Sequence, residues 1–172
     1  LGLLALMLLH DARREARLGE DGEIVLLAEQ DRSRWNRARI GEGTRLLERA
    51  LSHRRPGAYQ LQAAIAALHL EDTTDWPQIA ALYRELARLE PSPIVELNRA
   101  VAVAMADGPE RGLELVERID LPDYHLLHAA RADLLRRLER YDEAAAAYRQ
   151  ALALEMNAGD RAFLERRLTE VT

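Results

Sequence analysis

Apolar residues recur along this chain at the three- and four-residue spacing of amphipathic helices, and Pro, Gly and Asp separate the runs. This spacing predicts helices over 1–16, 34–53, 58–70, 76–89, 93–106, 109–118, 122–138, 141–155 and 159–170. Residues 18–31 interrupt the pattern, because the turn signal Glu20–Glu23 stands before a short apolar run. We expect a loop or a short hairpin there.

Three of the expected helices have marked starting points. Pro93 and Pro109 follow Ser92 and Gly108, and proline in a first helical turn costs no hydrogen bond. Asp75 precedes Trp76 and suits an N-cap, since its carboxylate can accept from a free backbone N–H.

The helical segments repeat at a period of 32 or 33 residues. A shift of 32 aligns Arg99 with Arg131, Ala100 with Ala132, Gly112 with Ala144 and Val116 with Tyr148. A shift of 33 aligns Ala67 with Ala100, Ile79 with Gly112 and Tyr83 with Val116. Two helices per period of this length are typical of a tetratricopeptide (TPR) solenoid. Small residues are expected where the two helices of a repeat cross.

The pattern predicts an all-α fold: a right-handed solenoid of TPR-like helical hairpins with an N-terminal helical pair, the 18–31 insertion and a C-terminal capping helix. We expect the helical pair over 1–56 and the repeats with their cap over 57–172, as one continuous domain and a fragment of a longer protein. The last helix has one polar and one apolar face, which suits the open end of a solenoid.

Composition narrows the functional classes. The net charge of −5 opposes binding of this segment to nucleic acid by itself, because phosphate recognition needs a surplus of positive charge. The chain has no cysteine, which excludes disulfides and thiolate metal sites and suits a reducing cytoplasm. The apolar run Leu1–Leu9 is too short to span a membrane.

Candidate chemistry is sparse along the chain. His125 and His128 lie three residues apart on one helix face, but two imidazoles alone do not fix a metal, and a packed or solvated pair is the favoured interpretation. We find no nucleophile with a base and an orienting group, and no glycine-rich phosphate loop. The sequence therefore predicts no catalytic residue, metal or cofactor, and a protein that is not an enzyme.

Polar residues on the first helices of the repeats form a candidate interaction groove, because first helices line the inner wall of such a solenoid. The candidates are Gln62, Glu96, Asn98, Arg99, His128, Arg131 and Asp133. Arg99 and Arg131 stand where the repeat usually has an apolar residue, and Glu96 and Asp133 are their natural internal partners. A polar network that fixes repeat stacking and a groove for an acidic segment both remain open.

Trp35 follows the insertion and is a candidate clamp that holds it onto the helices. A large aromatic side chain is usually mostly buried, which favours a core or clamp role over contact with a partner.

Several longer segments resemble the C-terminal extension of a group of bacterial extracytoplasmic-function sigma factors of the sigma-70 type. They are Leu3–Arg13, Gln30–Trp35, Tyr59–Ile65, Pro91–Pro93 with Val95–Val101, and Tyr124–Ala132. Together they span essentially the whole chain. In those proteins a TPR-like extension follows the two sigma regions that bind core RNA polymerase and the promoter.

The resemblance implies a regulatory, protein-binding domain of an alternative sigma factor. Its partners would be the sigma regions of the parent chain or RNA polymerase, DNA would be reached only through those sigma regions, and no membrane would be involved. The alternative is a module that senses a ligand or peptide in a concave polar groove.

Overall fold

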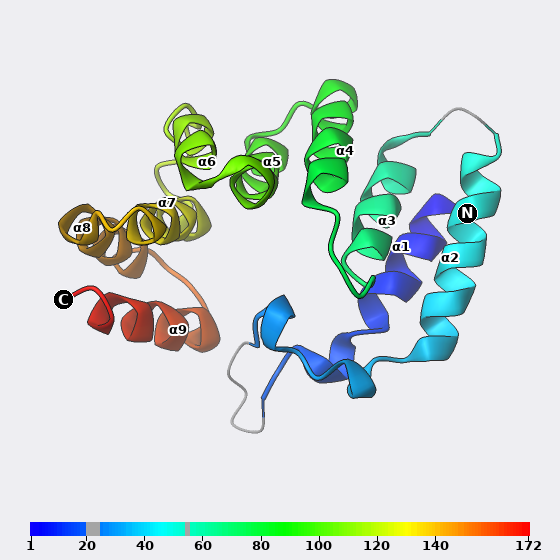
Figure 1. Cartoon of the computed structure of the whole chain (residues 1–172), viewed down its shortest axis with the longest axis horizontal. Helices are drawn as coiled ribbons and strands as arrows, with labels where there is room; N and C mark the ends of the chain where they lie inside the picture. The colour runs from blue at the N-terminus through cyan, green and yellow to red at the C-terminus, as the bar shows by residue number, and fades with distance from the viewer. Residues whose placement is uncertain (20–24, 54–55) are drawn as a thin grey trace. The chain divides into compact units, whose positions relative to one another are not determined.

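The computed structural model describes residues 1–19, 25–53 and 56–172, and these contain nine α-helices and no β-strand (Figure 1). The all-α prediction is therefore confirmed. The chain divides into two compact units, Leu1–Pro91 and Ser92–Thr172. The boundary predicted near residue 56 falls inside the first unit. No helix in the described part of the chain is long and apolar enough to cross a membrane.

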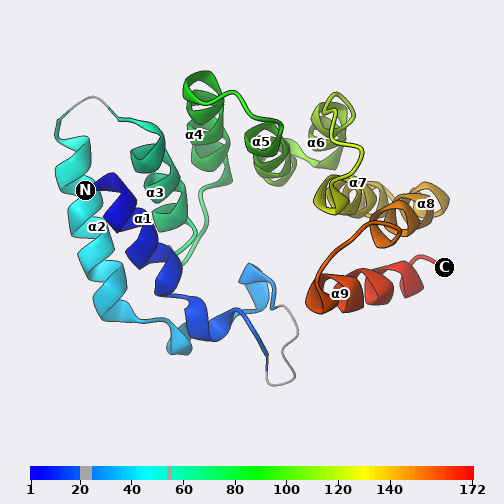
Figure 2. The same cartoon turned by 180° about the vertical axis from the view of Figure 1, so that it is seen from behind.

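Four helices build the first unit: α1 (Gly2–Asp11), α2 (Arg37–Leu51), α3 (Ala58–Leu68) and α4 (Trp76–Leu89). Helix α1 lies between α2 and α3 in both Figure 1 and Figure 2, and α4 packs on α3 as the second helix of a hairpin. The core of this unit includes Ala5, Leu9, Trp35, Leu47 and Ala63. Two of these five side chains are only methyl groups, which lets α1 approach α3 closely.

The insertion contains short 3₁₀ turns where it is described. These are η1 (Arg14–Ala16), η2 (Leu27–Glu29) and η3 (Arg32–Arg34). Val25 N donates to Arg17 O at 3.0 Å, so the two described ends of the insertion meet. The predicted turn signal Glu20–Glu23 lies outside the described residues.

Five helices build the second unit: α5 (Pro93–Asp107), α6 (Pro109–Val116), α7 (His125–Arg137), α8 (Tyr141–Leu152) and α9 (Ala158–Thr169). Each packs on the next along the chain, and α5–α6 and α7–α8 are the two helical hairpins (Figure 2). Consecutive packing of hairpins is the arrangement of a helical repeat.

The predicted repeat equivalences are confirmed inside this unit. Ala100 and Ala132 have no exposed surface, and Val116 and Tyr148 are 2% and 1% exposed. Helix α6 crosses α5 at Gly112, where an added Cβ would lie 3.0 Å from Ala100 O and would overlap the methyl group of Ala104. The sequence therefore places its smallest residues at the helix crossing, as expected.

Helix starts follow the predicted caps. Asp75 Oδ1 accepts from Gln78 N at 2.9 Å, and Ser92 Oγ accepts from Ile94 N at 3.3 Å. Four boundaries differ from expectation by three residues or more. Helix α7 begins at His125 and not at 122, and α8 ends at Leu152 and not at 155. The other two are on α1 and α2. Helix α1 ends at Asp11 and not at residue 16, since the chain turns into η1 there. Helix α2 begins three residues later than predicted, because Asn36 Oδ1 accepts from Arg39 N and caps it.

The C-terminal helix α9 closes the second unit. Leu164 is buried in the core of this unit, and Phe163 and Leu168 pack partly against the same core. Arg161 Nη1 donates to Leu152 O at 3.2 Å, which ties α9 to the end of α8. The opposite side is polar, and Glu165 and Arg166 are exposed. This is the two-faced helix that a capping role requires.

Candidate functional site

The seven predicted groove residues belong to both units. Gln62 is half-buried on α3 of the first unit, and the other six lie on α5 and α7 of the second. Of those six, only Asn98 is exposed, and the others are half-buried. The structure therefore brings the six residues of α5 and α7 into one unit.

Arg99 has the internal partner that was predicted for it. Its Nε donates to Glu96 Oε2 at 2.7 Å, one helical turn earlier on α5. The arginine side chain is 25% exposed and the glutamate side chain 39%. The pair is thus screened by water on one side, and its contribution to folding is small.

Arg131 pairs differently from the prediction. Its Nη2 lies 3.8 Å from Glu117 Oε1, at the end of α6. Asp133 instead accepts from Arg136 Nη2 at 2.6 Å. The expected Arg131–Asp133 pair does not form because residues two apart on a helix point to different sides, whereas residues three apart are neighbours.

The two histidines of α7 contact different elements. His128 Nε2–H donates to Pro122 O at 2.7 Å, which fixes the start of the helix. His125 Nε2 lies 3.3 Å from Asp160 Oδ2 and connects α7 to α9. Within residues 1–19, 25–53 and 56–172, no three His, Asp or Glu side chains are arranged to hold a metal ion.

An exposed stripe on α5 was not singled out from the sequence as a surface. Ile94, Asn98, Val101 and Met105 follow one another at four-, three- and four-residue spacing, and the three apolar side chains are 47%, 39% and 44% exposed. Spacing of this kind puts all four on one helix face.

Helix α7 contacts this stripe at its Met105 end. Arg137 Nη2 donates to Ala104 O at 3.3 Å, and its Nη1 contacts Met105 Sδ at 3.5 Å. Leu126, three turns before Arg137 on the same face of α7, is 41% exposed. Ile94, Asn98, Val101 and Met105, with Leu126 and Arg137, are called the α5–α7 face below.

Trp35, the candidate clamp, is 3% exposed and belongs to the core of the first unit. Leu27 of the insertion packs partly against the same core. The guanidinium carbon of Arg32 lies 4.8 Å from the centre of the Trp35 ring, and Arg32 Nη1 donates to Glu71 O at 2.8 Å. These contacts hold the described end of the insertion against the turn that follows α3, as expected of a core or clamp residue.

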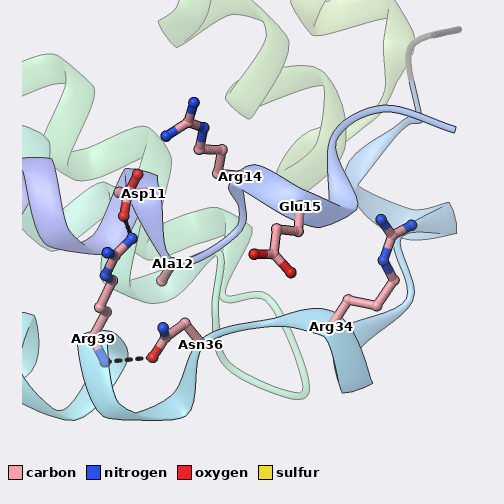
Figure 3. A pocket seen from close by; sticks show the side chains of 7 residues that line it. All are labelled: Asp11, Ala12, Arg14, Glu15, Arg34, Asn36 and Arg39. Atoms are coloured by element: carbon pink, nitrogen blue, oxygen red, sulfur yellow. Dashed lines mark hydrogen bonds and ion pairs between the residues drawn. The ribbon is translucent and has the colours of Figure 1, made fainter.

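A polar hollow of about 420 Å³ lies beside the end of α1 (Figure 3). It is lined by Asp11, Ala12, Arg14 and Glu15 from α1 and η1, and by Arg34, Asn36 and Arg39 from η3 and α2. Asp11 forms an ion pair with Arg39, and Asn36 N donates to Ala12 O at 2.9 Å. The sequence did not predict this hollow. Its two walls, residues 11–15 and 34–39, are distant in the sequence and meet only through tertiary contacts.

Comparison with known proteins gives two matches. Residues 1–51 match a family described as "Family of unknown function (DUF6596)". An uncharacterized protein of Rhizobium meliloti (strain 1021) is 46% identical over 174 residues, which covers 98% of this chain and 41% of the relative. The chain thus spans about two-fifths of the length of this curated relative. No solved structure matches the chain.

Proposed function

We propose that this chain is a regulatory protein-interaction domain of an alternative sigma factor, and that it modulates transcription initiation through contacts with the sigma regions or RNA polymerase. The observation that carries the proposal is the α5–α7 face. Val101 and Met105 are large apolar side chains that the packing of their own unit leaves open to solvent. Exposed apolar residues that gather on one surface are typical of a binding site for another protein.

The resemblance to the extension of extracytoplasmic-function sigma factors supplies the biological setting. The match over residues 1–51 covers Leu3–Arg13 and Gln30–Trp35, two of the segments that carry the resemblance. The identity to the longer relative extends over both units. A net charge of −5 suits a domain that faces the basic, DNA-binding regions of its own parent chain in the cytoplasm.

We infer that the domain acts by binding and not by catalysis. The polar side chains on α5 and α7 that catalysis would require already contact groups of their own unit. Arg99 pairs with Glu96, Arg131 pairs with Glu117, and His128 donates to Pro122 O. Such contacts position helices, and they leave none of these side chains as a base beside a nucleophile.

The direct test is transcription in vitro with the longer protein that carries this chain. Full-length protein is compared with a truncation that ends before Leu1, at equal amounts of core polymerase and promoter. We expect the truncation to change the yield of transcript severalfold while the sigma regions still bind the polymerase. Equal transcript from both proteins at every concentration would contradict the proposal.

A second candidate function is the sensing of a small ligand or peptide. The observation in its favour is the polar hollow of about 420 Å³ beside α1, which is large enough for a small polar molecule. If this function is correct, replacement of Arg34 by Met should abolish a ligand response and leave α5–α7 contacts intact. Regulation that is unchanged in this variant would favour the protein-interaction function alone.

A further inference from the structure

Four basic side chains gather where α1 and α3 end in the first unit, outside the α5–α7 face and the polar hollow. They are His10, Arg13, Arg17 and His69. Arg17 Nη2 lies 2.9 Å from His10 Nδ1 and donates to His10 O at 3.2 Å. His10 and His69 are brought together by the packing of α1 on α3.

This cluster contains buried polar atoms without partners. The Nε of Arg13 and the Nδ1 of His69 are shielded from solvent, and neither has a hydrogen-bond partner among the described residues. Glu71 and Asp72 follow α3, and Asp72 lies 3.5 Å from Arg32. A buried donor without an acceptor is unfavourable for folding, so an added acceptor would be favoured at this cluster.

The electrostatics show the same surplus of positive charge. Burial, with Arg13 and His10 facing the ring, lowers the pKa of His69 to about 4. Burial and Arg17 lower the pKa of Arg13 as well. For His10, burial, Arg17 and Arg13 lower the pKa. The cations of His10, Arg13 and His69 are thus disfavoured first by burial and then by their basic neighbours, and a negative group would offset the repulsion between them.

Helix C-termini offset only part of this charge. Their carbonyl groups carry partial negative charge, and Arg17 uses one of them at His10 O. Arg13 Nε makes no such contact in the described structure. The four basic side chains therefore lack a small acceptor that could bind the unpartnered N–H group of Arg13.

We propose that His10, Arg13, Arg17 and His69 form a binding site for a compact oxyanion, either a phosphate group or a carboxylate. Arg13 and Arg17 supply guanidinium N–H groups, the donors that match phosphate and carboxylate oxygens best. The imidazole of His69 adds a third positive charge once the anion is bound, because the anion favours the protonated ring. This site is independent of the α5–α7 face, so either one can fail without the other.

His69 provides the measurement, because burial and the neighbouring charges of Arg13 and His10 lower the pKa of its ring. The proton resonance of its imidazole is followed by NMR as a function of pH in chloride, in inorganic phosphate and in a tri-glutamate peptide, all at equal ionic strength. We expect the midpoint of His69 to rise by about one pH unit or more in at least one of the two oxyanions. The edge-on contact between the His69 and Trp76 rings, with centres 5.3 Å apart, offers tryptophan fluorescence as a second readout.

Arg13→Met is the test variant, and Arg14→Met is its matched control. Arg14 is the next residue, is exposed and lines the polar hollow instead. We expect Arg13→Met to raise the midpoint of His69 in chloride, since a repelling charge is removed, and to abolish the further shift by the oxyanion. Arg14→Met should retain that shift. If Arg13→Met does not fold, Arg13→Lys keeps the charge without the planar fork, and it should reduce the shift.

The two probes separate the sources of the oxyanion. A shift in phosphate alone assigns a phosphate group, and a shift in the peptide alone assigns the carboxylates of a protein segment. Both results support the site. No shift beyond that in chloride with either probe, or an equal shift in Arg13→Met, would overturn it.

Discussion

Gly112 of α6 packs directly against Ala104 of α5, so closely that a Cβ on residue 112 would overlap the alanine methyl group. The same Cβ would lie 3.0 Å from Ala100 O, which is tighter than most Cβ contacts in proteins. This crossing determines the distance between α5 and α6, the first hairpin of the second unit. Ala144 on α8 is the repeat equivalent of Gly112 and has no exposed surface.

Replacement of Gly112 by Ala should destabilise the second unit. The gain in helix propensity is at most about 1 kcal/mol, whereas overpacking at a tight crossing costs about 1–3 kcal/mol. Denaturation in urea measures the difference. Gly41→Ala is the control, because its Cβ would meet only Arg45 Nη1, at 3.5 Å, and should stabilise the protein slightly. Recovery in Ala104→Gly/Gly112→Ala would identify the overlap as the cause, and a stable Gly112→Ala would refute it.

Stability should fall as the pH drops from about 6.5 to about 4, in part because of His69. Its pKa is lowered from 6.5 to about 4 by burial and by Arg13 and His10. Between these pH values, His69 is protonated in the unfolded chain but not in the folded chain, so acid favours unfolding. After solvent screening we expect a loss on the order of 2 kcal/mol. Urea denaturation at several pH values should show a weaker pH dependence for His69→Gln, and an equally steep one would contradict this origin.

Arg99→Met and Arg131→Met should each change the free energy of unfolding by less than about 1 kcal/mol, because both ion pairs are partly exposed. We also expect transcriptional regulation to persist in both variants, since each arginine has its own carboxylate. Thermal melting and transcription in vitro test the two statements. A regulatory defect in a stably folded variant would instead assign these arginines to a binding groove for an acidic segment.

The isolated chain should not bind duplex promoter DNA at about 150 mM salt. Because its net charge is −5, the chain lacks the contribution to DNA affinity that comes from release of counterions from the phosphate backbone. A mobility-shift assay at low micromolar protein measures this. A retarded band that survives at this salt concentration would show that the domain carries a local basic surface for DNA.

The helices were largely predictable because their signals are local. Helix α4 begins and ends as expected, since Asp75 caps it and its apolar spacing is regular. The end of α1 was missed because neither Gly nor Pro follows Asp11, and the apolar pattern continues through Ala16. The start of α2 was misplaced because Arg34 and Trp35 fit a helical pattern that the Asn36 cap excludes.

The sites depend on tertiary packing and were less predictable. Glu96 and Arg99 are three apart on one helix, so their pairing follows from sequence. Arg13 and His69 are 56 residues apart, and only the packing of α1 on α3 brings them together. The exposure of Val101 was equally hidden, because apolar residues on an amphipathic helix are first assigned to the core.

The most direct measurement is transcription in vitro by the full-length protein with Val101→Glu, which places a charge in the centre of the α5–α7 face. Tyr141→Glu is the matched control, since this tyrosine is also an exposed residue of the second unit, but at the start of α8. With both variants folded, the account predicts that Val101→Glu reproduces the change in transcript yield seen on truncation and that Tyr141→Glu behaves as the wild type. Wild-type regulation by Val101→Glu would contradict the claim that this face binds the regulated partner.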